Sequence, residues 1–202
     1  MSYHYNSHIV QNGLVLCLDA KDSMARGPNL IPDGEFHDGI TGWSGYAGTA
    51  ISRVGASVDP GSASGGSDDY CLKVSGPYMA YIDIKTVIGK SYWVTLRGYD
   101  SAGGNSLKIS NTSDGGNISG TSEVYVSGAS WQAKTQTFTA TATTTYIRVG
   151  ANSGGGGGSN LSYWDSIYVY EMLWKDLSGN GNNGAVNNTV YQSGSIEHFD
   201  FD

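Results

Sequence analysis

Short runs in which apolar and polar residues alternate recur along most of the chain, with Gly, Asn and Ser between them. A period of two places the apolar side chains on one face of a β-strand and the polar ones on the other. The runs that predict strands are 13–20, 70–74, 80–85, 91–99, 107–109, 123–126, 137–140, 145–150 and 163–169. No window combines the 3.6-residue period of a helix with capping residues. The pattern therefore predicts an all-β sandwich of short strands.

Composition agrees with a fold of many strands and turns. Gly accounts for 30 of 202 residues, Pro for only 4, and charged residues for 14%, against roughly 25% in an average globular protein. The net charge is −7 with only 11 Lys and Arg, which disfavours the clustered cations of a nucleic-acid-binding surface. No apolar stretch approaches the length of a membrane span, and the N-terminus lacks the basic start and apolar run of a signal peptide. We expect neither a nucleic-acid nor a membrane partner.

Two local features have structural interpretations. Cys17 and Cys71 each lie among apolar strand residues, which favours two buried thiols over the alternative of a disulfide. Neither cysteine has partners at the short spacing of a metal site. Five consecutive glycines, Gly154–Gly158, fall between two predicted strands. A mobile loop is therefore preferred to an interdomain linker.

Two segments far apart in the chain resemble one continuous motif. They are GLVLCLDA at 13–20 and LWKDLSGNGNNG at 173–184. Together they resemble the opening of concanavalin-like (laminin-G-like) domains of virion structural proteins from tailed phages, in which the two parts lie close in sequence. The resemblance implies that residues 1–28 and 172–202 form a partial concanavalin-like β-sandwich or docking segment. Residues 29–171 would then be an inserted domain.

The inserted segment has motifs of its own. They are NLIPDGEF at 29–36 followed by Gly42-Trp43, a strand entered from Gly89-Lys90, Trp131 with TFTA at 137–140, and YWD at 163–165. In this order they resemble the carbohydrate-binding modules of families 4, 9 and 22. The resemblance implies a jelly-roll β-sandwich for residues 29–171. It also implies that Phe36, Trp43 and Trp131 pack in the core.

The candidate sugar-binding residues follow from strand parity. Trp93, Arg97 and Tyr99 share the face opposite to the apolar residues of their strand. The same parity selects Tyr146, Arg148 and Asp83 on two other strands. Aromatic faces that stack on sugars and polar groups that bind hydroxyls suit a saccharide site, and the resemblance implies that the site lies on the concave sheet. The alternative is that these aromatic residues serve packing alone.

The resemblance also implies a structural calcium ion, bound by an early acidic residue and by an Asp of the last strand. Asp165 occupies the second position, and Glu35 is the candidate for the first, with Asp38 as the alternative. No cofactor is required otherwise. No set of His, Ser, Cys and acidic residues has the local context of a catalytic site, so we expect a protein that is not an enzyme.

The resulting hypothesis is a non-enzymatic virion protein of a phage, a structural, decoration or fibre subunit. Its carbohydrate-binding-like domain would contact host surface polysaccharide. Apolar residues in the two flanks predict docking on other virion subunits or on copies of this chain as a homo-oligomer, burying at least roughly 1,000 Å². Two alternatives stay open: a carbohydrate-binding module of a bacterial glycoside hydrolase, and a purely structural jelly roll that binds no sugar.

Overall fold

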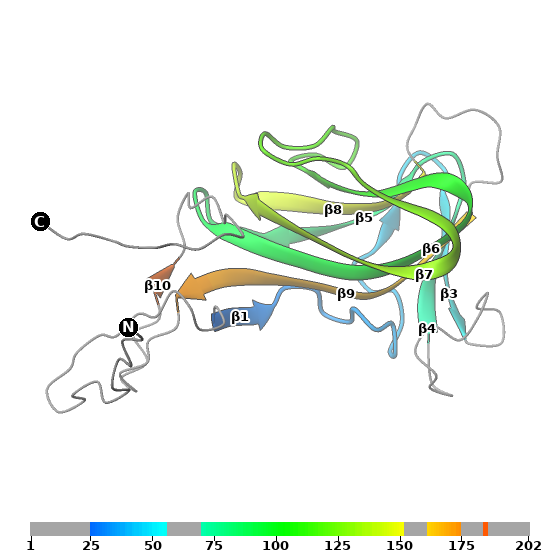
Figure 1. Cartoon of the computed structure of the whole chain (residues 1–202), viewed down its shortest axis with the longest axis horizontal. Helices are drawn as coiled ribbons and strands as arrows, with labels where there is room; N and C mark the ends of the chain where they lie inside the picture. Colours follow the sequence, from blue (N-terminus) through cyan, green and yellow to red (C-terminus); the bar gives the residue numbers. More distant parts are fainter. Residues whose placement is uncertain (1–24, 56–69, 152–160, 175–183, 186–202) are drawn as a thin grey trace, which may run out of the picture.

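The structure is a computed structural model, and it describes residues 25–55, 70–151, 161–174 and 184–185 (Figure 1). Within these residues the chain forms a sheet of 10 strands and no helix, so none of their elements is a helix that could cross a membrane. The prediction of an all-β fold is confirmed. The strands are β1 (Ala25–Asn29), β2 (Ser44–Gly45), β3 (Ala50–Gly55), β4 (Tyr70–Ser75), β5 (Met79–Lys85), β6 (Ser91–Ser110), β7 (Val124–Thr139), β8 (Thr144–Ala151), β9 (Leu161–Trp174) and β10 (Gly184–Ala185).

The sheet folds over on itself to make the two layers of a sandwich (Figure 1). The strand order is β2-β5-β8-β6-β9-β4-β3, and β7 pairs with β6 along most of its length. β6 belongs to both layers, because its residues 92–100 pair with β9 and its residues 105–110 pair with β8. The first layer therefore contains β3, β4, β9 and the first half of β6. The second layer contains β2, β5, β8 and the second half of β6.

The passage of β6 between the layers differs from the sequence prediction. Two separate strands were expected at 91–99 and 107–109, whereas β6 runs from Ser91 to Ser110. Its pairing with β7 shifts register between Gly98 and Asp100 and again between Asp100 and Asn105. Such bulges bend a strand and increase its twist, which lets one strand turn from the first layer into the second.

The predicted alternation identifies the side chains that lie between the layers. In β6, Tyr92, Val94 and Leu96 are at most 2% exposed, and Ile147 and Val149 of β8 are fully buried. All five belong to one apolar cluster. Other members of that cluster are Phe36, Trp43, Ile82, Ile84, Leu107, Ile109, Trp164 and Ile167. The core assignments of Phe36 and Trp43 are confirmed, and their rings lie 6.1 Å apart.

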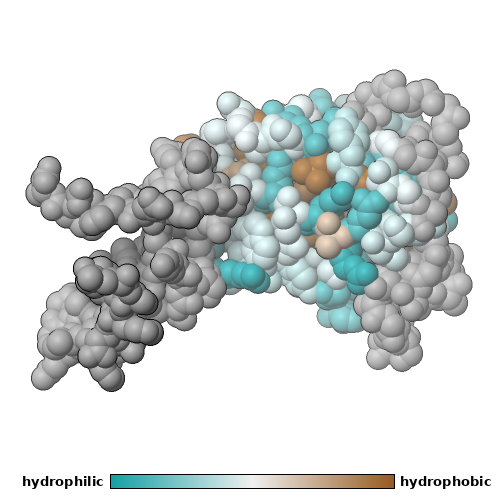
Figure 2. All heavy atoms as spheres, viewed as in Figure 1, coloured by the Kyte–Doolittle hydropathy of each residue, from teal (hydrophilic) through white to brown (hydrophobic). Residues whose placement is uncertain are grey.

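Because one core lies between the layers, the residues of opposite parity form two outer faces on opposite sides of the sandwich. We call the outer side of the first layer the tryptophan face; it carries Trp93, Arg97, Tyr168 and Tyr170. The outer side of the second layer is the tyrosine face. It carries Tyr81 and Asp83 of β5, Tyr146 and Arg148 of β8, and Lys108 of β6. On the side drawn in Figure 2, hydrophilic and neutral residues cover most of the coloured surface, with small apolar areas between them.

The two ends of the predicted insert lie side by side. Asn29 pairs with Tyr170, and Arg26 pairs with Met172, so the expected proximity of Asn29 and Glu171 is confirmed. β1 and β10 both pair with the end of β9. The hydrogen-bonded sheet thus extends past both ends of the 29–171 segment. The strand predicted at 13–20, the glycines 154–158 and the predicted docking flanks lie largely outside the described residues.

Candidate functional site

The six candidate sugar-binding residues do not form one site. Trp93, Arg97 and Tyr99 extend from the first half of β6 in the first layer. Tyr146, Arg148 and Asp83 lie on β8 and β5 in the second layer. Parity placed each residue correctly on an outer face. The expectation of a single cleft is wrong, because the core separates the two groups.

On the tryptophan face, three rings lie next to one another. The ring centroids of Trp93 and Tyr170 are 6.1 Å apart with planes inclined by 28°. Those of Tyr170 and Tyr168 are also 6.1 Å apart, inclined by 19°. The guanidinium carbon of Arg26 lies over two of these rings, 4.1 Å from the centroid of Trp93 and 5.4 Å from that of Tyr170. Cation–π attraction holds the cation there, so Arg26 covers the surface that a sugar ring would need.

Tyr99 is a packing residue. It is 9% exposed, whereas the strand pattern predicted a partly exposed residue in a cleft. Its ring lies 5.9 Å from that of Trp131 and 6.1 Å from that of Tyr163, and the same cluster contains the buried Cys71. Trp131 thus belongs to this second cluster instead of the main core. The burial expected of Cys71 is confirmed, and Cys17 lies outside the described residues.

On the tyrosine face, aromatic and charged side chains form two rows across neighbouring strands. In the first row Tyr81 of β5 pairs with Arg148 of β8, and Arg148 pairs with Lys108 of β6. In the second row Asp83 pairs with Tyr146. The rings of Tyr81 and Tyr146 meet edge to face at 5.7 Å, and both residues are half-buried. The face therefore offers two aromatic surfaces beside a guanidinium and a carboxylate.

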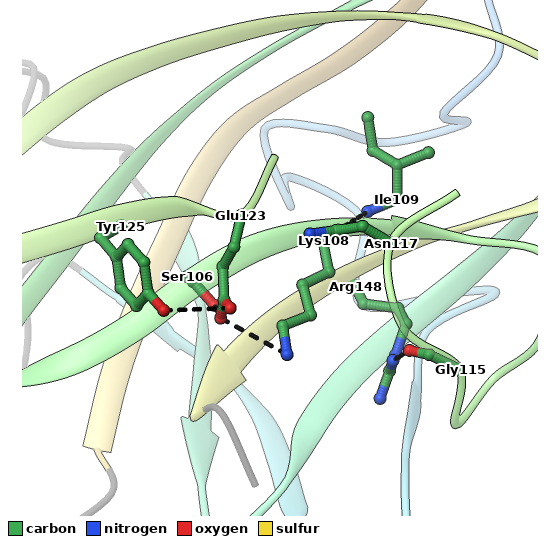
Figure 3. A network of polar contacts seen from close by, with 8 residues as sticks. All are labelled: Ser106, Lys108, Ile109, Gly115, Asn117, Glu123, Tyr125 and Arg148. Carbon is green, nitrogen blue, oxygen red and sulfur yellow. Dashed lines mark hydrogen bonds and ion pairs between the residues drawn. The ribbon is translucent and has the colours of Figure 1, made fainter. Parts of the chain in front are cut away.

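Arg148 lies at the centre of the tyrosine face and is 5% exposed. Its Nη1 donates a hydrogen bond to the carbonyl of Gly115, in the loop between β6 and β7 (Figure 3). Burial lowers the pKa of Arg148, and the nearby charges of Asp114 and Glu123 oppose this shift. A guanidinium remains charged even so. The fold therefore holds a cation in a poorly solvated position.

A network beside Arg148 was not anticipated from the sequence. Glu123 accepts hydrogen bonds from Ser106 and from the hydroxyl of Tyr125, the latter at 3.1 Å, and its Oε1 lies 3.5 Å from Nζ of Lys108 (Figure 3). The side chains of Lys108 and Glu123 are only 14% and 15% exposed. Alternation in Leu107-Lys108-Ile109 would have placed Lys108 on the outer face. The pairing with Glu123 depends on the approach of β7, which the local pattern does not encode.

The two candidate calcium ligands do lie together. Ser166 Oγ is 3.3 Å from Glu35 Oε2 and 3.4 Å from Asp165 Oδ2. The other oxygens are also occupied, because Glu35 Oε1 accepts from Tyr168 and Asp165 Oδ1 accepts from the amide of Ser166 at 2.7 Å. Because the Ser166 hydroxyl has a single proton, it donates to one of the two carboxylates at a time, so three of the four carboxylate oxygens accept hydrogen bonds within the protein at once.

Calcium requires six to eight oxygen ligands, and the surroundings of this pair do not provide them. The carbonyls of Phe36 and His37, in the same loop as Glu35, both accept hydrogen bonds from the guanidinium of Arg53, the first at 2.6 Å. Within the described ranges no group of three His, Cys, Asp or Glu residues could hold a metal ion. The residues present do not fit a calcium ion. Hydroxyl, amide and guanidinium groups of the chain donate hydrogen bonds to the oxygens that a calcium ion would need.

We therefore predict that stability does not depend on calcium. Treatment with EDTA should leave the melting temperature unchanged, because no ion-binding free energy is lost from the folded state. The measurement is thermal unfolding with EDTA and with millimolar CaCl2, with Asp165→Asn as the control. A calcium-dependent rise in melting temperature that disappears in Asp165→Asn would restore the calcium site implied by the sequence resemblance.

Comparison with known proteins supports the fold at the level of structure. No family description and no curated protein matches the sequence. Solved structures do match. An arabinose-bound α-L-arabinofuranosidase aligns with a TM-score of 0.53 and 12% identity, over 71% of this chain and 26% of that one. The CBM22-1 and GH10 modules of Clostridium thermocellum xylanase 10B, complexed with xylohexaose, align with a TM-score of 0.50 and 13% identity, over 84% and 30%.

The enzymatically active domain of tailspike protein 4 from bacteriophage CBA120 aligns with a TM-score of 0.50 and 10% identity, over 71% of this chain and 21% of that one. These likenesses show the fold. The chain is a jelly-roll β-sandwich of the carbohydrate-binding-module type, as predicted. It spans between 21% and 30% of the three chains that it matches, so the activities of those proteins do not transfer to it.

Proposed function

We propose that the chain is a non-catalytic carbohydrate-binding module that holds saccharide on its tyrosine face. The observation that carries the proposal is the pair of half-buried rings, Tyr81 and Tyr146, beside Arg148 and Asp83. Tyrosine rings bind the apolar faces of sugars, and charged donors and acceptors bind their hydroxyls. The tryptophan face is less suitable because Arg26 lies over Trp93 and Tyr170.

The proposal includes the absence of catalysis. Glycosidases position two carboxyl groups on either side of the bond they cleave. On the tyrosine face Glu123 is engaged by Lys108, Ser106 and Tyr125, and Asp83 is exposed beside Lys85 at 4.0 Å. Glu123 is therefore held by contacts within the protein, and Asp83 has no second carboxylate placed opposite it on this face among the described residues. We expect bound polysaccharide to be released intact.

We further propose that the module belongs to a phage virion protein and contacts host surface polysaccharide. This rests on the GLVLCLDA and DLSGNGNNG motifs of the flanks, which lie outside the described residues except at 184. In this proposal residues 1–28 and 172–202 dock on other virion subunits or on copies of this chain. The second candidate is a module of a glycoside hydrolase; the arabinofuranosidase and xylanase likenesses favour it. Detection of the chain in purified virions by mass spectrometry would support the first and exclude the second.

Binding is tested by affinity electrophoresis and calorimetry with a panel of neutral and acidic polysaccharides. We expect at least one to bind, with no release of reducing ends. Tyr146→Ala should weaken that binding about fivefold, since a stacked ring contributes roughly 1 kcal/mol. Trp93→Ala, a change of an aromatic residue on the opposite face, is the matched control and should leave it unchanged. Failure of the whole panel to bind would refute the proposed function.

A further inference from the structure

The guanidinium of Arg148 has fewer partners than its burial calls for. Its Nε is buried and has no hydrogen-bond partner, and Nη1 donates only to the Gly115 carbonyl. Among the residues that the structure describes, no carboxylate oxygen forms an ion pair with it within 4.0 Å. Buried charges are normally paired and hydrogen-bonded, and an exception calls for an explanation.

The neighbour across the strand pair makes this arrangement less favourable still. Arg148 pairs directly with Lys108, and like charges at directly opposed positions destabilise a sheet. Glu123 answers the charge of Lys108 at 3.5 Å, while it also accepts from Ser106 and Tyr125. Glu123 therefore pairs with Lys108, and Asp83 lies beside Lys85. Asp114 and Glu123 act on Arg148 only from a distance, so within the described residues no carboxylate forms a direct ion pair with it.

The geometry points to an acidic saccharide, a sugar unit that bears a carboxylate, as the ligand of the tyrosine face. This inference rests on the proposed function and names its ligand class. The planar fork of Arg148 matches a carboxylate in two-point hydrogen bonding. Lys108 lies beside it as a second positive charge, and the rings of Tyr81 and Tyr146 lie next to Arg148 for the adjoining sugar faces. A carboxylate that reaches the exposed part of this guanidinium, in a residue that is 5% exposed, would give its charge a direct counter-ion.

The test compares each acidic polysaccharide with a form of itself in which the carboxyl groups are reduced to primary alcohols. The probes are polygalacturonate, alginate and hyaluronate. Reduction of their carboxyl groups retains the ring shape and the linkage and removes the charge. We expect at least one parent polymer to bind. Its reduced form should bind with an affinity at least about tenfold lower, because a charge-assisted pair is lost.

Variants locate the effect. Lys108→Gln and Arg148→Gln should weaken binding of the acidic polymer by a clearly larger factor than they weaken binding of the reduced polymer, because only the acidic polymer also loses a charge pair. Lys73→Gln makes the same change of charge on β4, on the tryptophan face, and should change neither. Retained circular dichroism and a cooperative unfolding transition establish that each variant is folded.

The outcomes separate this inference from the proposed function. Equal affinity for parent and reduced polymers, both weakened by Tyr146→Ala, leaves a carbohydrate-binding module and overturns the acidic preference. Binding of neutral polysaccharides alone, or equal losses in Lys73→Gln and Lys108→Gln, overturns it as well. If neither neutral nor acidic polymers bind, the proposed function itself is refuted.

Discussion

Replacing Gly34 with alanine is expected to destabilise the protein by at least about 3 kcal/mol, because the segment cannot accommodate a side chain there. Gly34 is buried where the β1–β2 connection crosses β9, and its carbonyl accepts a hydrogen bond from the amide of Ile167 at 3.0 Å. A Cβ at this position would lie 2.0 Å from the carbonyl oxygen of Ile167. The obstacle is backbone of a central strand, so relief requires the loop or β9 to move.

Urea unfolding of Gly34→Ala gives the free energy of unfolding from the midpoint and slope. Gly116→Ala is the control, because a Cβ at Gly116 meets no atom within 4 Å and its backbone is not left-handed. We expect the control to unfold like the wild type within about 0.5 kcal/mol. A wild-type midpoint for Gly34→Ala would contradict the close approach of the loop to β9.

Replacing Arg148 with methionine is expected to move stability and binding in opposite directions. Methionine keeps much of the volume and removes a charge that burial disfavours, as the lowered pKa of Arg148 indicates. Exchanging a buried charged group for an apolar one of similar size stabilises some proteins by about 1–4 kcal/mol, and repulsion from Lys108 disappears as well. We therefore expect a gain of about 1 kcal/mol together with loss of acidic-saccharide binding.

Lys108→Met is the contrasting variant. It removes the cation that pairs with Glu123, whose side chain is 15% exposed, so a poorly solvated carboxylate keeps its hydrogen bonds from Ser106 and Tyr125 and loses this positive charge. Breaking such a pair is destabilising. Urea unfolding of both variants should therefore show a raised midpoint for Arg148→Met and a lowered one for Lys108→Met. Equal losses of stability in the two variants would show that Arg148 stabilises the folded state and would contradict the expected destabilising effect of its buried charge.

The sequence predicts much of this fold because burial in a sandwich follows strand parity. Tyr92, Val94 and Leu96 face the core and Trp93 does not, as the alternation of the strand requires. Parity assigns a residue to a face of its own strand, and it cannot tell which layer the strand occupies. β6 crosses between the layers through shifts of register near Asp100. Its first half carries Trp93 and Arg97 in the first layer, whereas β8, with Tyr146 and Arg148, pairs with its second half in the second layer. The candidate residues therefore form two groups on opposite sides of the sandwich.

Other parts of the site depend on contacts between segments distant in sequence. Glu35 and Asp165 meet through Ser166, which has a positive φ of 51° in β9. Arg53 reaches back from β3 to the carbonyls of Phe36 and His37. The motif resemblance correctly predicted that Glu35 and Asp165 lie close together. It could not show that Arg53, Ser166 and Tyr168 supply the donors around them.

Amide chemical-shift mapping during titration with the best-binding polysaccharide fragment shows whether saccharide binds on the tyrosine face. We expect the largest shifts at Tyr81, Tyr146, Arg148 and the loop at Gly115, with the resonances of Trp93, Tyr168 and Tyr170 unmoved. Shifts confined to Trp93, Tyr168 and Tyr170, with the resonances of β5 and β8 unchanged, would place the ligand on the tryptophan face and refute binding on the tyrosine face.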